Sequence, residues 1–153
     1  ADWQGALSET GRRLAEVTDG QSNSLLLSEV RTRAHRLDPR GAWAIPWPGA
    51  SLLAVAYHDD NRAAPGELAQ TPNAEAPDVL FRCPEPGEAD SEGLPCVAWQ
   101  APDGYVADAP RSRHAGGVNA AFLDGHVEFL PDSIDATTMA QMVSVDDGLV
   151  LSE

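Results

Sequence analysis

Apolar residues form short runs near both ends of the chain, and these runs predict strands and helices. The segment SLLLSEV at 24–30 is typical of a strand, and GASLLAVAY at 49–57 is typical of a buried strand. SIDATTMAQMVS at 133–144 has the spacing of a short helix with one apolar face. Together these runs predict an α+β fold with an antiparallel sheet and short helices. The predicted helix is expected to turn three side chains inward: Met139, Met142 and Val143.

The clearest strand pattern lies at 118–130, where VNAAFL and HVEFL flank Asp124 and Gly125. Asp-Gly between two strand-like runs predicts a hairpin with a two-residue type I′ turn. Counting outward from that turn places Phe122 opposite Val127. On this register one face of the hairpin is apolar and is predicted to face the core. That face would consist of Val118, Ala120, Phe122, Val127 and Phe129.

The middle of the chain, residues 59–112, holds eight of the twelve prolines and is expected to form long surface loops within one domain that spans 1–153. Cys83 and Cys96 bracket PEPGEADSEGLP, whose proline, glycine and acidic residues predict neither helix nor strand. A disulfide between the two cysteines would order this segment and contribute about 3 kcal/mol. The alternatives are two free thiols or half of a metal site. A disulfide would indicate an oxidising, extracytoplasmic location, either the periplasm or the cell surface.

The net charge of −14 argues against nucleic acid as a partner, because a phosphate backbone would be repelled. All ten basic residues are arginine, and residues 121–153 hold seven acids and no arginine. One end of the fold is therefore expected to be strongly acidic. That end is either a solvated surface or a binding site for a divalent cation.

No apolar run approaches the roughly 20 residues of a membrane-spanning helix, so no span is expected within this chain. The chain begins ADWQGAL without a methionine, as a processed or truncated protein would. We therefore expect that a segment upstream of this sequence is missing.

His114, Asp124 and His126 resemble a set of metal ligands, but strand geometry argues against a shared ion. A strand rises about 3.3 Å per residue, which places His114 and Asp124 about 20 Å apart at opposite ends of the hairpin. We therefore expect a structural His114 beside a bend at Gly116 and Gly117, and a turn at Asp124 and Gly125.

The remaining polar cluster is YHDDN at 57–61, where Asp59, Asp60 and Asn61 could bind calcium or simply form a turn. The sequence contains no G-x-S-x-G, no P-loop and no G-x-G-x-x-G pattern. We therefore expect no catalytic residue, no enzymatic activity and no cofactor, with calcium as the alternative.

Two segments resemble one known family. SRHAGGVNAAFLDGHVEFLPDSID, in which nine residues separate His114 from Asp124 and Gly125, resembles the H-x9-DG signature of the bacterial DUF1559 family of pilin-like proteins. LAEVTDGQSNSLLLSEVRTR resembles that family's second block, a T-D-G-x-S-N segment that leads into a strand ending in Glu29. The two blocks occur in the expected order and cover both ends of the chain.

The resemblance implies a pilin-like globular head that normally follows a cleaved, apolar N-terminal helix, which this sequence lacks. It implies a structural subunit of a pilin or type II secretion pseudopilin assembly, with protein partners that are copies of itself or a membrane-associated complex. It assigns no catalytic role to His114, Asp124 or Gly125. The alternative function is a surface or periplasmic binding module that docks on a membrane complex or holds calcium or a glycan.

Overall fold

The structure, a computed structural model, describes residues 5–7, 11–47, 49–57, 70–99, 106–146 and 148. Within these ranges no helix is both long enough and apolar enough to span a bilayer. The elements, in chain order, are η1 (Leu14–Glu16), β1 (Leu25–Ser28), β2 (Ala54–Tyr57), β3 (Asp78–Leu80), α1 (Pro86–Ser91), β4 (Cys96–Ala98), β5 (Val106–Asp108), β6 (Gly117–Phe122), β7 (Val127–Pro131) and α2 (Ala136–Val143).

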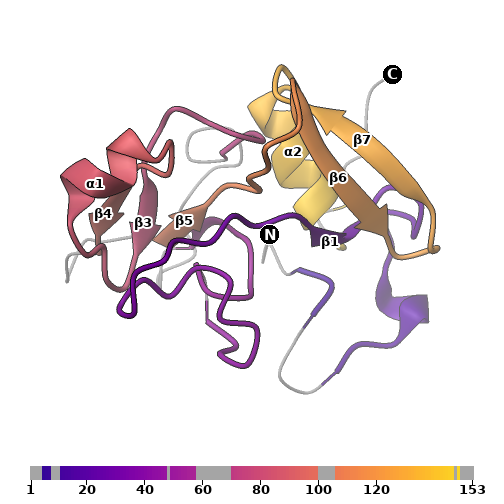
Figure 1. Ribbon diagram of the computed structural model, residues 1–153. Helices are drawn as coiled ribbons and strands as arrows, with labels where there is room; N and C mark the ends of the chain where they lie inside the picture. Colours follow the sequence, from indigo (N-terminus) through magenta and orange to yellow (C-terminus); the bar gives the residue numbers. More distant parts are fainter. Residues whose placement is uncertain are drawn as a thin grey trace.

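One sheet has three antiparallel strands in the order β1-β6-β7. Its inner face packs against α2, which lies beside β6 in Figure 1. The side chain of Asp135 accepts hydrogen bonds from the first-turn N–H groups of Thr137 and Thr138, so it caps α2 at its N-terminus. The predicted helix is confirmed, and its inward side chains join a core of Leu25, Val118, Ala120, Phe122, Leu130 and Met139.

The second sheet has four strands in the order β2-β5-β3-β4. Its strands β3 and β4 run parallel, whereas β5 is antiparallel to both β2 and β3. This sheet is therefore mixed, whereas the three-stranded sheet that contains the C-terminal hairpin is antiparallel, as the sequence predicted. Residues 59–112, expected to be mainly loops, supply three of its strands and α1. Figure 1 shows α1, β3 and β4 at one end of the molecule and β6, β7 and α2 at the other, with β5 between them.

Helix α1 lies inside the segment for which the sequence predicted neither helix nor strand, so that prediction was wrong. Pro86 occupies the start of the helix, where a missing N–H is harmless. Gly93 has a φ of 67° directly after the helix, a conformation that ends helices without steric cost. Ala89 is buried against Leu80 and Cys96, so tertiary packing stabilises a helix of only 6 residues. The fold as a whole is α+β, as predicted.

Candidate functional site

The H-x9-DG block forms the β6–β7 hairpin, but its turn differs from the predicted one. The N–H of Gly125 donates to the carbonyl of Phe122 at 3.0 Å, and the N–H of Phe122 donates to the carbonyl of His126 at 3.0 Å. Gly125 has a φ of 91°, whereas Asp124 is not among the residues with positive φ. Residues 123–125 therefore form a three-residue hairpin loop. Such loops consist of a type I turn followed by one residue in the left-handed conformation, here Gly125. The type I′ prediction was wrong, although Gly125 does occupy a position that favours glycine.

The longer loop shifts the register of the hairpin by one residue. Ala121 lies opposite Val127, and Val118 lies opposite Leu130. Because side chains alternate along a strand, a shift of one residue moves every side chain of β7 to the other face. Leu130 is consequently buried, whereas Val127 and Phe129 are exposed on the outer face. The prediction that Val127 and Phe129 of β7 belong to the core was therefore wrong. The prediction was correct for β6, where Val118, Ala120 and Phe122 are buried.

His114 binds to the end of strand β1. Its Nε2 lies 3.1 Å from Oε1 of Glu29 and 3.2 Å from the side-chain amide nitrogen of Asn119. The other carboxylate oxygen of Glu29 accepts the backbone N–H of Asn119 at 2.7 Å. This last bond, followed by the smaller contribution of His114, lowers the pKa of Glu29. His114 thus completes a clamp between β1 and β6.

Gly116 and Gly117 allow the chain to enter β6 beside β7. Gly116 has a φ of 84°, and its carbonyl accepts the N–H of Asp132 at 2.9 Å. A Cβ atom at Gly117 would collide with the carbonyl oxygen of Leu130 and would lie 2.7 Å from the ring of Phe129. Gly116 is therefore favoured for its positive φ, and Gly117 is favoured because no side chain would fit there.

Asp124 binds to its own turn rather than to His114. Its Oδ1 accepts the backbone N–H of His126 at 3.0 Å and lies 2.6 Å from Nδ1 of the same histidine. The bond from the backbone N–H, followed by that from the side chain, lowers the pKa of Asp124. The ring of His126 in turn stacks on Phe122, with the ring centroids 4.4 Å apart. His114 and Asp124 therefore have separate partners in the clamp and the turn.

In the part of the chain that the structure describes, no three histidine, cysteine or acidic side chains are grouped as metal ligands. The weak calcium candidates Asp59, Asp60 and Asn61 lie outside the described residues.

The second sequence block packs against the first. The N–H of Leu123 donates to the carbonyl of Ser24 at 3.0 Å, and the N–H of Asp124 donates to that of Gln21 at 3.2 Å. The TDGQSN turn thus contacts the loop of the hairpin, while Glu29 contacts the far end of β6. The two blocks, distant in sequence, together build the three-stranded sheet.

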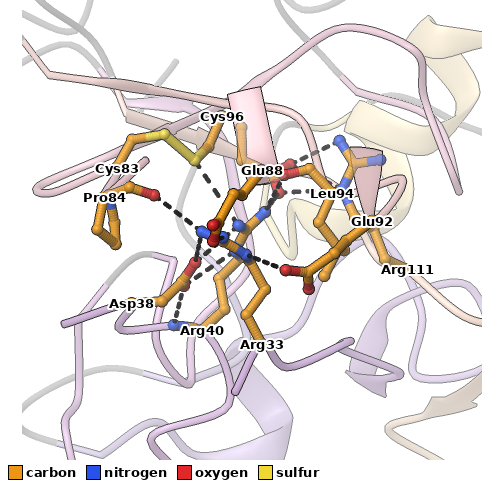
Figure 2. Close-up of a disulfide and its surroundings, with 11 residues drawn as sticks. Arg33, Asp38, Arg40, Cys83, Pro84, Glu88, Glu92, Leu94, Cys96 and Arg111 are labelled. Carbon is orange, nitrogen blue, oxygen red and sulfur yellow. Dashed lines mark hydrogen bonds and ion pairs between the residues drawn. A yellow bond between two sulfur atoms is a disulfide. The ribbon is translucent and has the colours of Figure 1, made fainter. Parts of the chain in front are cut away.

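Cys83 and Cys96 form a disulfide, as the sequence predicted. The bond joins the chain just after β3 to the first residue of β4, and it closes the segment that contains α1 (Figure 2). A guanidinium nitrogen of Arg40 donates to the sulfur of Cys96 at 3.7 Å. The disulfide is therefore packed against a second feature that sequence reasoning missed.

That feature is a buried charge network, which we name the arginine cluster and define as Arg33, Asp38, Arg40, Asp78 and Arg111. Figure 2 labels its members Arg33, Asp38, Arg40 and Arg111. Asp78 accepts hydrogen bonds from Arg40 at 3.0 Å and from Arg111 at 2.8 Å. Arg111 also donates to the carbonyls of Ala74 and Ala76. The members are scattered along the chain, so no local pattern could have revealed the cluster. The absence of lysine was the one weak signal, because arginine is the usual cation of buried ion pairs.

The pKa values of two acidic side chains, Asp38 in the cluster and Asp108 beside it, change in opposite directions. Burial alone would raise the pKa of Asp38, but hydrogen bonds and charge from Arg40, with help from Arg33, outweigh it and lower that pKa. Burial, followed by the charge of Asp78, raises the pKa of Asp108 to about 8. Both carboxyl oxygens of Asp108 are buried without a hydrogen-bond partner. A pKa of about 8 favours the neutral, protonated form of Asp108 at pH 7, beside the charged side chains of Asp78, Arg40 and Arg111.

Exposed apolar side chains lie together on the outer side of each sheet. Along β3 and β4 the residues that alternate with buried Leu80 and Cys96 point outward. The exposed fraction is 53% for Phe81, 37% for Trp99 and 47% for Trp47. The ring centroids of Trp47 and Phe81 lie 5.8 Å apart. We name this surface the aromatic face and define it as Trp47, Phe81, Val97 and Trp99.

The three-stranded sheet has a comparable surface. Leu27, Ala121 and Val127 lie side by side across the three strands, with Leu27 at 59% and Val127 at 68% exposure. We name this surface the hairpin face and define it as Leu27, Ala121, Val127 and Phe129. Groups of exposed apolar side chains of this kind mark interaction sites more often than isolated ones do.

A family model covers most of this chain. The model of a family described as a protein of unknown function, DUF1559, matches residues 4–137. Searches among curated proteins and among solved structures found no match. The matched range includes the clamp, the turn, the disulfide and the arginine cluster. The chain therefore belongs to the DUF1559 family.

Proposed function

We propose that this chain is a non-enzymatic, extracytoplasmic structural subunit, the pilin-like or pseudopilin-like head of an assembly, which acts by docking on protein partners. The observation that carries this proposal is the presence of two apolar sheet faces, the aromatic face and the hairpin face, on the outside of the fold. Exposed aromatic side chains are costly in water and are enriched at the centres of protein interfaces.

The motif residues support a structural role. His114 closes the clamp on Glu29, and Asp124 closes the turn with His126. A catalytic site needs groups that converge on one reacting atom, and these two pairs belong to different parts of the sheet. We infer that the H-x9-DG block builds the sheet whose outer face docks.

The disulfide supports the proposed location. Disulfides persist in oxidising compartments such as the periplasm and the cell surface and are rare in the cytosol. Because Cys83 and Cys96 are bonded and hold α1 against β4, we infer that the domain folds outside the cytoplasm.

Site-specific photocrosslinking in intact cells tests the proposal. A photoreactive residue at Phe81 or Val127, one on each face, is expected to form covalent adducts with neighbouring proteins of the cell envelope. The same residue at Leu14, exposed but on neither face, is the matched control. We also expect the complete gene to encode a prepilin-type cleavage site followed by about 20 apolar residues. Absence of adducts at both faces, or reduced cysteines in a cytoplasmic protein, would contradict the proposal.

A second candidate function is the binding of a glycan on the aromatic face. The rings of Trp47 and Phe81 are half exposed and adjoin each other, and the guanidinium carbon of Arg82 lies 6.0 Å from the centroid of Phe81. Apolar rings beside a polar group could stack on sugar rings and bond their hydroxyls. Binding of a glycan that is lost in Phe81→Ser but kept in Val127→Ser would favour this function over docking.

A further inference from the structure

We propose that copies of this chain associate head to tail, with the aromatic face of one copy docked on the hairpin face of the next. The inference rests on the proposed function and names the partner of its two faces, a second copy of the same chain. It goes beyond that function because docking alone would allow any protein partner.

The first support is the placement of the faces. The aromatic face belongs to β3 and β4, and the hairpin face belongs to β1, β6 and β7. Figure 1 shows these two groups of strands at opposite ends of the molecule. One copy could therefore engage a neighbour through each face at the same time, without the two neighbours competing for the same surface.

The second support is charge complementarity. Arg82 stands beside Phe81 on the aromatic face, and within the described residues no carboxylate pairs with it. Carboxylates border the hairpin face, because Glu29 lies in the row of Asn119 and Phe129 and Asp124 lies at the turn. Each of these carboxylates also contacts a histidine, His114 or His126. Docking unlike faces brings the guanidinium toward the carboxylates, and complementary charges of this kind orient partners.

The same charges disfavour pairing of like faces. Two aromatic faces would bring together two copies of Arg82, whereas two hairpin faces would bring together the carboxylates of Glu29 and Asp124. Like charges across an interface cost free energy, so symmetric dimers are expected to be less stable than the unlike pairing. When the aromatic face of one copy binds the hairpin face of another, the pair still has one free aromatic face and one free hairpin face. Further copies can therefore add at both ends, which builds an open chain of subunits unless the rotation between them closes a ring.

The test uses the full 153-residue chain in sedimentation velocity over a wide concentration range at low salt. Phe81→Glu places an acid on the aromatic face, and Val127→Glu places one on the hairpin face. Both side chains are exposed, so each variant should retain the fold, which circular dichroism and thermal unfolding would verify. Leu14→Glu makes the same change on an exposed leucine of neither face and is the matched control.

The wild-type chain and Leu14→Glu are expected to form species larger than a dimer as concentration rises. Phe81→Glu alone and Val127→Glu alone should remain monomeric. An equal mixture of the two should form a dimer of twice the monomer mass and nothing larger, because it contains one intact aromatic face and one intact hairpin face that can pair. Added salt should weaken the association of the wild-type chain.

Three results would overturn the inference. A wild-type chain that stays monomeric at all concentrations would exclude association with a second copy, as would a mixture that stays monomeric. Self-association of either single variant would show that like faces pair. The proposed function would survive each result if photocrosslinking at Phe81 or Val127 still captured another envelope protein, and it would fail with the inference if no protein were captured.

Discussion

Nε2 of His114 lies 3.1 Å from the carboxylate of Glu29, although 85 residues separate the two along the chain. The contact joins the segment that leads into β6 to the residue that follows β1. The carboxylate also accepts the backbone N–H of Asn119. It therefore supplies the acceptor that a backbone carbonyl would supply if β1 continued past Ser28. Two segments that are distant in sequence therefore meet at one carboxylate.

Removal of either side chain of this clamp should destabilise the domain to different degrees. Glu29→Ala is expected to lower the free energy of unfolding by about 1–2 kcal/mol, because a charged acceptor of a backbone N–H is lost. His114→Ala should lower it by less than about 1 kcal/mol, because the ion pair is largely exposed to solvent. Denaturant unfolding of both variants and of the double variant measures this. Losses that simply add in the double variant would show that the two side chains are not coupled.

The turn of the hairpin should depend on Gly125. A Cβ at Gly125 meets no atom within 4 Å, so the strain of Gly125→Val comes from its φ of 91° alone. A β-branched residue in this conformation is expected to lower the free energy of unfolding by more than about 1 kcal/mol. Gly87→Ala, which also has open space but no positive φ, is the control and should be neutral or stabilising by up to about 1 kcal/mol. Equal melting temperatures for the two variants would refute this assignment.

The arginine cluster should be sensitive to the loss of one charge. Asp78→Ala leaves Arg40 and Arg111 buried with fewer acceptors, which is expected to cost about 3–5 kcal/mol of unfolding free energy. Glu75→Ala removes an exposed acid three residues earlier and serves as the control, with an expected change below about 0.5 kcal/mol. Comparable stability of the two variants in denaturant would show that the cluster contributes little.

Asp108 should make stability depend on pH. Its pKa in the folded chain is about 8, against an ordinary value of 3.8, so the folded state retains a proton that the unfolded state has lost. This contribution is complete below pH 3.8 and declines as the pH rises to about 8, with a slope of at most about 1.4 kcal/mol per pH unit. Asp108→Asn should remove that decline, whereas Asp90→Asn, an exposed control, should keep it. Urea unfolding between these pH values measures the slopes, and identical slopes in both variants would contradict the prediction.

The disulfide should be complete in the purified protein and should stabilise it. Thiol counting under denaturing, non-reducing conditions is expected to find no free thiol, and reduction should release two. Replacement of both Cys83 and Cys96 by alanine should lower the free energy of unfolding by about 3 kcal/mol, because the chain between them is no longer closed. Two free thiols before reduction would remove the support that the bond gives to an oxidising location.

The sequence by itself determined the local features of this protein. Glycine at positions of positive φ, Asp135 as a helix cap and the alternation on β6 are each decided by a few neighbouring residues, so the hairpin, α2 and the α+β class could be predicted. The disulfide was also predictable, because the chain has only two cysteines and they bracket one short segment.

Tertiary structure decided what depends on distant partners. One additional loop residue at the turn reversed the faces of β7, and local propensity could not reveal this because both turns suit Asp124 and Gly125. Helix α1 exists because Ala89 packs on Leu80 and Cys96, which its own composition does not encode. The arginine cluster and the two apolar faces likewise arise only when strands far apart in sequence meet, since burial is a property of the assembled sheets rather than of any segment.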